Sequence, residues 1–297
     1  MTRIRMLCLA LAAGFLLLPG AAQAAKPPKR FYVSLGDSYA TGYQVLSADG
    51  TVRDNTRNGF AYQIPKLAAK RGYNLKLVNF GCGGATTTSM LEQTTPCNNR
   101  VFDGHSWGGK TQVAAAEKFL RAHRGKVALI TVSIGGNDVT ACARQADPFS
   151  CVAAATQTLK ENVTEAAVRL RAAAGKKVKL VGTTYPDVIL GGWVGENPNQ
   201  GLAQASVPAF KALINPTLKA AYAEAKGGFA DVTEATGAYT PLDQTTTLAP
   251  YGVIPVAVAR ICELTYYCQF RDIHSRTEGY KVIAKLVTKQ LPEHKRR

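Results

Sequence analysis

The chain has 297 residues and a formal net charge of +16 at pH 7, and 46% of its residues are hydrophobic. This length and apolar content allow one large domain or two small ones, and they exclude a disordered or fibrous protein. The basic residues are spread along the chain, apart from a short cluster at residues 294–297, and no nucleic-acid-binding motif accompanies them. We therefore interpret the charge as a solvated basic surface and expect no nucleic-acid partner.

The first 24 residues have the pattern of a secretory signal peptide. Arg3 and Arg5 precede an apolar run over residues 6–18, and Ala22-Gln23-Ala24 offers the small residues that a signal peptidase accepts. The run is too short for a membrane span, and no second long apolar stretch follows. We expect cleavage after Ala24 and export of one domain over residues 25–297, a monomer without an integral membrane segment.

Beyond the signal, segments typical of strands alternate with segments typical of helices. Short apolar runs predict buried strands at residues 30–35, 75–80, 126–134, 177–183 and 229–232. Apolar residues at helical spacing predict helices at residues 60–71, 111–123, 151–174, 207–226 and 277–290. This alternation implies an α/β fold in which helices cover both faces of a parallel sheet. Residues 191–200 and 239–268 are loop-rich, and we expect them to wall a cleft.

Six cysteines follow the signal, which itself contains Cys8. An even number in an exported chain indicates disulfides, although six cysteines can pair in many ways. They fall into three neighbouring pairs that each flank one loop, so we predict the bridges Cys82–Cys97, Cys142–Cys151 and Cys262–Cys268. The alternative is a zinc site, which the lack of a C-x-x-C pair and the scattered histidines disfavour.

Three strand ends carry glycine-rich and polar sequence, at the edge where a parallel sheet binds ligands. They are Gly36-Asp37-Ser38-Tyr39, residues 81–86 and residues 135–138. One such segment alone is most often a turn, but three at successive strand ends converge on one place. Ser38 supplies a hydroxyl nucleophile for acyl transfer. Its backbone N–H, the N–H of Gly84 and the side-chain amide of Asn137 supply three donors for an oxyanion.

The general base for such chemistry must be one of four histidines. His123 is predicted at a helix end and His294 in the charged tail, while His105 lies in a loop and stays open. His274 lies in Asp272-Ile273-His274-Ser275, directly before the last predicted helix, and has a carboxylate nearby. We predict that His274 is the base, against the alternative that it caps the helix or is only solvated.

These segments resemble the blocks of the GDSL/SGNH hydrolase family, in the same order. Gly36-Asp37-Ser38-Tyr39-Ala40-Thr41-Gly42 matches the block GDSxxxG, residues 79–84 look like the second block, Gly135-Gly136-Asn137-Asp138 matches GxND, and the segment ending in His274 looks like the last. The cysteine placement is most similar to that of secreted actinomycete-type members. The resemblance implies a three-layer α/β/α, flavodoxin-like fold with a central parallel sheet, and it implies the same roles for Ser38, His274 and the oxyanion donors.

The last block departs from the family pattern. The family commonly has an aspartate three residues before the histidine, but that position is Arg271 here, and Asp272 is two residues before His274. Alternate residues of an extended segment point to the same side, so Asp272 reaches the ring if the chain turns slightly. Otherwise a backbone carbonyl holds the ring N–H and the site is a Ser–His dyad. The sequence leaves both arrangements open.

The resemblance implies a secreted esterase or lipase that cleaves small-molecule or lipid carboxylic esters through an acyl-enzyme on Ser38, without a metal or organic cofactor. Polysaccharide O-deacetylases, phospholipases and acyltransferases use the same kind of site, so the catalytic residues do not separate them. A carbohydrate- or lipid-binding module on this fold is the alternative from another class, although such a module would lose its nucleophile or base first. Tyr185, Trp193 and Tyr251 are candidates for the pocket wall, with packing as the alternative role.

Overall fold

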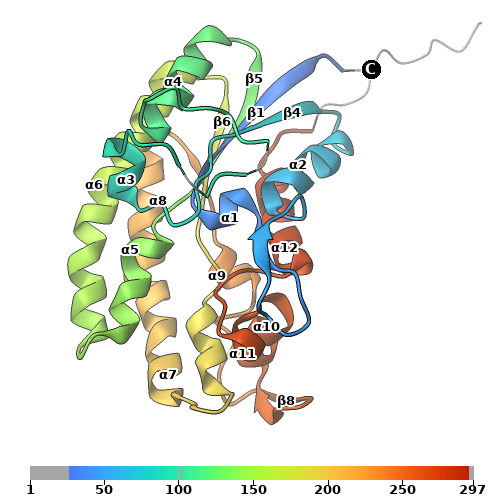
Figure 1. The fold of residues 1–297 in the computed structure, drawn as a ribbon, viewed down its shortest axis with the longest axis vertical. Helices are drawn as coiled ribbons and strands as arrows, with labels where there is room; N and C mark the ends of the chain where they lie inside the picture. Colours follow the sequence, from blue (N-terminus) through green and yellow to red (C-terminus); the bar gives the residue numbers. More distant parts are fainter. Residues whose placement is uncertain (1–26, 98, 102, 294–297) are drawn as a thin grey trace, which may run out of the picture.

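The computed structural model of the protein describes residues 27–97, 99–101 and 103–293 (Figure 1). The predicted export signal with Cys8 lies outside these residues, and so does the basic cluster with His294. In the described part of the chain, no helix has the length and apolar character needed to cross a membrane.

Five parallel strands form the central sheet, in the order β4-β1-β5-β6-β7. They are β1 (Lys29–Gly36), β4 (Asn74–Asn79), β5 (Val127–Ser133), β6 (Lys179–Thr183) and β7 (Gly228–Ala230). Counted along the chain, this order is the 2-1-3-4-5 order of flavodoxin-like folds. Every residue of β5 is buried, which is why its sequence reads as one continuous apolar run.

Helices cover both faces of the sheet, so the predicted three-layer α/β/α fold is confirmed. One face packs against α4 (Gln112–Ala122), α6 (Pro148–Ala174) and α8 (Asn215–Glu224), and the other against α2 (Phe60–Ala69) and α12 (Thr277–Lys289) (Figure 1). Shorter helices lie near the strand ends: α1 (Ser38–Thr41), α3 (Thr87–Glu92), α5 (Gly136–Thr140), α7 (Gln200–Pro208), α9 (Val232–Ala235), α10 (Val256–Leu264) and α11 (Tyr267–Phe270). The remaining elements are the 3₁₀ helices η1 (Ala141–Arg144) and η2 (Val188–Trp193), the π-helix η3 (Ala209–Ile214), and two hairpins, β2 (Tyr43–Val45) with β3 (Arg53–Asn55) and β8 (Thr245–Leu248) with β9 (Gly252–Pro255).

The longest helix shows how local sequence sets its start. The side chain of Asp147 accepts a hydrogen bond from the N–H of Ser150, which satisfies a free donor in the first turn of α6. Pro148 occupies the first turn, where its missing N–H breaks no helical hydrogen bond. The helix therefore begins at Pro148, three residues earlier than predicted.

Two segments differ from the sequence prediction. The helix predicted at residues 207–226 begins earlier, at Gln200, and passes through the π-helix η3 before continuing as α8, with Pro216 as the second residue of α8. The predicted loop at residues 239–268 contains the helix α10. The exposed face of α10 carries only Arg260 and Glu263, and its other residues are buried or half-buried.

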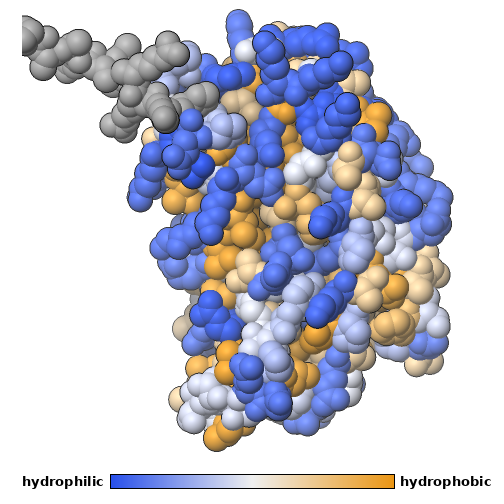
Figure 2. Space-filling view, turned by 180° about the vertical axis from the view of Figure 1, so that it is seen from behind, coloured by the Kyte–Doolittle hydropathy of each residue, from blue (hydrophilic) through white to orange (hydrophobic). Residues whose placement is uncertain are grey.

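The rear face of the molecule is mostly hydrophilic, with smaller apolar areas between the hydrophilic side chains (Figure 2). The hydrophilic side chains are spread over this face and do not gather in one region. This distribution fits the even spacing of charged residues along the sequence.

Candidate active site

The segments singled out in the sequence lie together at the carboxyl end of the sheet. Ser38 follows β1, Gly84 lies in the turn after β4, and Asn137 lies in α5 directly after β5. The strand order reverses at β1, and open α/β sheets bind ligands beside such a reversal. His274 reaches the same place from the segment between α11 and α12.

A tight turn presents Ser38 at the end of β1. Gly36 has φ +135°, and a Cβ there would lie 2.0 Å from the carbonyl oxygen of Ser133, so only glycine lets β1 end so close to β5. The Asp37 carboxylate then accepts a hydrogen bond from the N–H of Tyr39 at 2.9 Å and starts α1. Ser38, the first residue of α1, is 8% exposed and is held in one place by this turn.

A hydroxyl, an imidazole and a carboxylate form one hydrogen-bonded line in this site. Oγ of Ser38 lies 2.8 Å from Nε2 of His274, and Nδ1 of His274 lies 2.7 Å from Oδ1 of Asp272. The same Asp272 oxygen accepts the backbone N–H of His274 at 2.9 Å. Such a line can activate a serine hydroxyl, because the imidazole accepts its proton while the carboxylate orients the ring.

The unusual spacing of Asp272 has a structural explanation. Arg271, at the family's aspartate position, adopts φ +52° and donates hydrogen bonds to the carbonyls of Gly191 and Val194. The following residue, Asp272, therefore turns toward His274, and the ring N–H meets a carboxylate and not a backbone carbonyl. Burial by itself would raise the pKa of Asp272, but the hydrogen bonds and charge of His274 and the charge of Arg53 bring this pKa below its usual value.

The three predicted oxyanion donors lie in segments that meet at Ser38. In the described part of the chain, neither the N–H of Ser38 nor that of Gly84 donates a hydrogen bond. The Asn137 amide donates one N–H to the carbonyl of Ala85 at 2.8 Å, which orients the side chain and leaves a second N–H. A Cβ at Gly84 would meet nothing within 4 Å, so its φ of +80°, and not close packing, is the reason for glycine there.

The other described histidines lie elsewhere. His123 stacks on Phe119 with ring centroids 4.0 Å apart, and its Nδ1 lies 2.9 Å from the carbonyl of the same residue. His105 also packs against Phe119, at 5.3 Å, and against Phe80, at 4.8 Å. His274 is therefore the histidine within reach of Ser38 among the described residues.

Tyr185 and Asp37 form a buried pair beneath Ser38 that the sequence did not reveal. The Tyr185 hydroxyl donates to Oδ2 of Asp37 at 2.5 Å, and its ring packs edge-on against Tyr39 with centroids 4.9 Å apart. Burial raises the pKa of the Asp37 carboxyl to about 7, even though the hydrogen bonds from Tyr185 and Tyr39 oppose the rise. No sequence pattern links residues on different strand ends, so only the fold brings this pair together.

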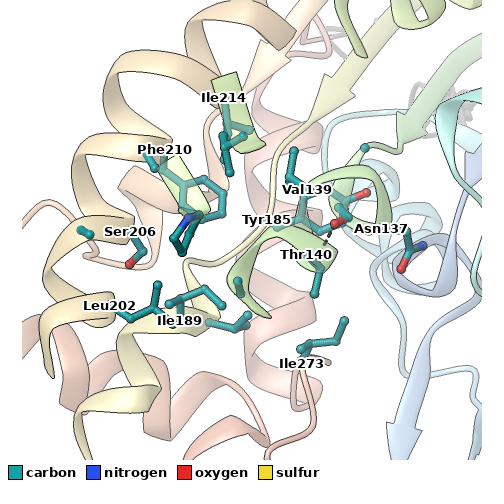
Figure 3. Close-up of a pocket in the computed structure, with 18 of the residues that line it drawn as sticks. Asn137, Val139, Thr140, Tyr185, Ile189, Leu202, Ser206, Phe210, Ile214 and Ile273 are labelled. Carbon is teal, nitrogen blue, oxygen red and sulfur yellow. Dashed lines mark hydrogen bonds between the residues drawn. The ribbon is translucent and has the colours of Figure 1, made fainter. Parts of the chain in front are cut away.

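An apolar cavity of about 470 Å³ opens beside Ser38 and Asn137 (Figure 3). It lies between α5, η1 and the start of α6 on one side and η2, α7 and η3 on the other. Its apolar lining includes Val139, Ile189, Leu202, Phe210 and Ile214. Tyr185 lines the cavity as expected, but Trp193 and Tyr251 do not, because they pack against the cluster around α10.

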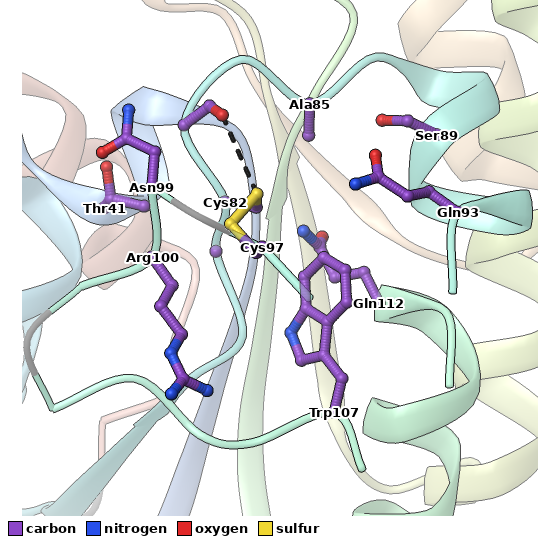
Figure 4. Close-up of a disulfide and its surroundings, with 12 residues drawn as sticks. Thr41, Cys82, Ala85, Ser89, Gln93, Cys97, Asn99, Arg100, Trp107 and Gln112 are labelled. Carbon is purple, nitrogen blue, oxygen red and sulfur yellow. Dashed lines mark hydrogen bonds between the residues drawn. A yellow bond between two sulfur atoms is a disulfide. The ribbon is translucent and has the colours of Figure 1, made fainter. Parts of the chain in front are cut away.

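Three disulfides brace loops around the site, and they join the predicted pairs. Cys82–Cys97 closes the loop that carries Gly84, beside Asn99 and Trp107 (Figure 4). The other two are Cys142–Cys151, between η1 and α6, and Cys262–Cys268, between α10 and α11. With all six cysteines bonded, none is left as a thiolate for the alternative zinc site. The described residues contain no group of three or more histidine, cysteine or acidic residues that could hold a metal ion.

Comparison with known proteins gives the family. The model of the GDSL-like Lipase/Acylhydrolase family matches residues 34–282 of the chain. The extracellular lipase from Streptomyces rimosus is similar in structure over 86% of this chain and 99% of that chain, with 17% sequence identity and a TM-score of 0.52. The phospholipase A1 from Streptomyces albidoflavus NA297 is similar over 78% of this chain and 94% of that chain, with 20% identity and a TM-score of 0.45. No curated protein sequence matches the chain.

The match to the lipase supports the fold, and the family match spans the segments of Ser38, Gly84, Asn137 and His274. The chain therefore belongs to the GDSL-like lipase/acylhydrolase family of ester-cleaving hydrolases.

Proposed function

We propose that this protein is an exported carboxylic ester hydrolase that acts on esters with apolar acyl chains through an acyl-enzyme on Ser38. The observation that carries the proposal is the line of hydrogen bonds from Ser38 through His274 to Asp272, next to an apolar cavity of about 470 Å³. Export is supported by the three disulfides, a feature of oxidising compartments, and by the signal pattern of the first 24 residues.

In the proposed reaction, His274 removes the proton from Oγ of Ser38 while this oxygen attacks the ester carbonyl carbon. The backbone N–H groups of Ser38 and Gly84 and the amide of Asn137 donate hydrogen bonds to the oxyanion that forms. The bond to the alcohol oxygen then breaks, and His274 gives its proton to the leaving alcohol. A water molecule loses a proton to His274, attacks the acyl-enzyme and releases the carboxylic acid, and the proton returns to Ser38. Asp272 orients the imidazole and stabilises its charged form throughout.

The cavity supports an acyl chain longer than acetyl. Its lining is largely apolar and begins at Ser38 and Asn137, where the carbonyl of a substrate would lie. Each buried methylene contributes about 0.8 kcal/mol, or about a fourfold gain in affinity. An acetyl group would leave most of the cavity unused, so the cavity favours an esterase or lipase over a polysaccharide O-deacetylase.

The test is a panel of p-nitrophenyl esters from acetate to dodecanoate, together with an acetylated glycan and a phosphatidylcholine vesicle. We expect kcat/KM to rise at least about tenfold from acetate to octanoate, because the added methylenes enter the cavity. A maximum at acetate, or faster turnover of the acetylated glycan, would contradict the acyl-chain assignment and favour a deacetylase. Absence of hydrolysis across the whole panel would overturn the proposed function.

A further inference from the structure

The hairpin formed by β2 and β3 lies outside the central sheet and against the segment that carries His274. Its two strands pair antiparallel, with Val45 opposite Arg53 and Tyr43 opposite Asn55. Its first strand begins directly after Gly42, the last residue of the GDSxxxG block, but no sequence pattern relates the hairpin to His274. In the structure, however, it contacts the His274 segment at three positions.

The first contact is an ion pair with the triad carboxylate. Nη1 of Arg53 lies 3.1 Å from Oδ2 of Asp272, whose side chain is only 4% exposed. The two oxygens of the Asp272 carboxylate therefore have different partners. Oδ1 accepts both hydrogen bonds from His274, and Oδ2 faces Arg53. Nε of Arg53 also donates to the carbonyl of Gly50 at 2.8 Å, which holds the guanidinium in place.

The other two contacts come from β2. The ring of Tyr43 lies against the His274 ring, with centroids 4.7 Å apart. The buried amide of Gln44 donates to the carbonyl of Ser275 at 3.1 Å. Helix α12 holds strand β2 in place, because the hydroxyl of Tyr280 donates to the carbonyl of Tyr43 at 2.8 Å.

We propose that the β2–β3 hairpin positions the imidazole–carboxylate pair. Arg53 is the positioning residue that holds the Asp272 carboxylate toward His274. The proposal rests on the proposed function of the site. Without the guanidinium, Oδ2 of Asp272 has no other partner in the described part of the chain, and only the two hydrogen bonds from His274 to Oδ1 then orient the carboxylate.

The test compares kcat and KM of Arg53→Gln, Arg53→Lys and the matched control Arg57→Gln in p-nitrophenyl octanoate hydrolysis. Arg57 is 71% exposed and pairs with Asp103, outside the site. For Arg53→Gln we expect kcat to fall about tenfold with KM changed less than about twofold, a fraction of the loss that follows removal of the carboxylate itself.

Arg53→Lys keeps the charge but loses the planar fork, so we expect a partial recovery of kcat. Wild-type kcat in Arg53→Gln would overturn the proposal, as would a loss of kcat that Arg53→Lys does not reduce. Arg53→Met, which keeps the apolar stem, replaces Arg53→Gln if the latter does not fold. Ser38→Ala in the same assay separates this result from a failure of the proposed function: an inactive Ser38→Ala beside an unaffected Arg53→Gln rejects the positioning role alone.

Discussion

The hydroxyl oxygen of Ser38 and Nε2 of His274 lie 2.8 Å apart, although 236 positions separate the two residues along the chain. A hydrogen bond between their neighbours maintains this contact. The hydroxyl of Tyr39, directly after Ser38, donates to the carbonyl of Ile273, directly before His274, at 2.6 Å. The turn with the hydroxyl and the segment with the imidazole are thus tied together at two adjacent positions.

The carboxylate of Asp272 is open to a direct test. Asp272→Asn keeps the shape of the side chain but presents an amide to Nδ1 of His274, which favours the wrong tautomer of the ring. We expect kcat to fall on the order of 10³ to 10⁴-fold in p-nitrophenyl ester hydrolysis. A loss smaller than tenfold would mean that the imidazole works without the carboxylate, as a Ser–His dyad.

A substitution of Asn137 tests its role as a donor to the oxyanion. Asn137→Ala removes an amide N–H from the site, and we expect kcat to fall about 10² to 10³-fold with little change in KM, because the bond is made mainly in the transition state. Asn74→Ala is the matched control, since the exposed Asn74 amide donates to the carbonyl of Pro27 at the amino end of the sheet. Equal kinetics for Asn137→Ala and Asn74→Ala would remove Asn137 from the oxyanion hole.

A substitution in α7 that narrows the cavity tests whether the acyl chain binds there. Ala205 and its neighbour Gln204 are both exposed, but only Ala205 lines the cavity. We expect Ala205→Trp to lower kcat/KM for octanoate at least about tenfold and to change the value for acetate less than about twofold, because the indole displaces methylenes distant from the carbonyl. Gln204→Trp is expected to leave both esters unaffected. If Ala205→Trp slowed both esters equally, the acyl chain would have to bind elsewhere.

The carboxyl of Asp187, behind the cavity wall, predicts how the folding stability of the protein depends on pH. It is fully buried and accepts a hydrogen bond from Ser206, and burial raises the pKa of its carboxyl to about 7 in spite of that bond. In the unfolded chain the pKa is about 3.9, so between these values the folded state holds a proton that the unfolded state has lost, and stability falls as pH rises.

Asp187→Asn removes this titration and keeps an acceptor for Ser206. We expect the stability advantage of the variant over the wild type to grow by about 2–3 kcal/mol between pH 5 and pH 8. Denaturant unfolding at the two pH values measures it. A difference between variant and wild type that does not change with pH would show that the Asp187 carboxyl does not titrate in this range.

The fold class and the family followed from the sequence for a clear physical reason. Strands buried on both faces read as continuous apolar runs, as β5 does, and the glycine-rich blocks with Ser38 and Asn137 follow such runs directly. The spacing of the helical segments then left few ways to arrange a parallel sheet. The cysteine pairs were predictable because each closes a short loop.

Contacts between distant segments were not predictable. Arg53 meets Asp272 and Tyr185 meets Asp37 only because the chain folds back on itself, and no periodicity marks such pairs. The cavity wall was predicted only in part: Tyr185 lines it, but residues 239–268 do not. Phe210 was missed because it lies in a segment with an ordinary helical pattern, and the π-helix that carries it has no sequence signal of its own. The aspartate spacing could only be left open, because it depends on the left-handed conformation of Arg271.

The most direct test of the account is the rate of p-nitrophenyl octanoate hydrolysis by Ser38→Ala, measured beside the wild type at equal protein concentration. Because Oγ of Ser38 is the atom that attacks the ester, kcat/KM is predicted to fall on the order of 10⁴-fold or more, with unchanged thermal unfolding. A variant that folds normally and keeps activity within tenfold of the wild type would contradict the assignment of Ser38 as the nucleophile.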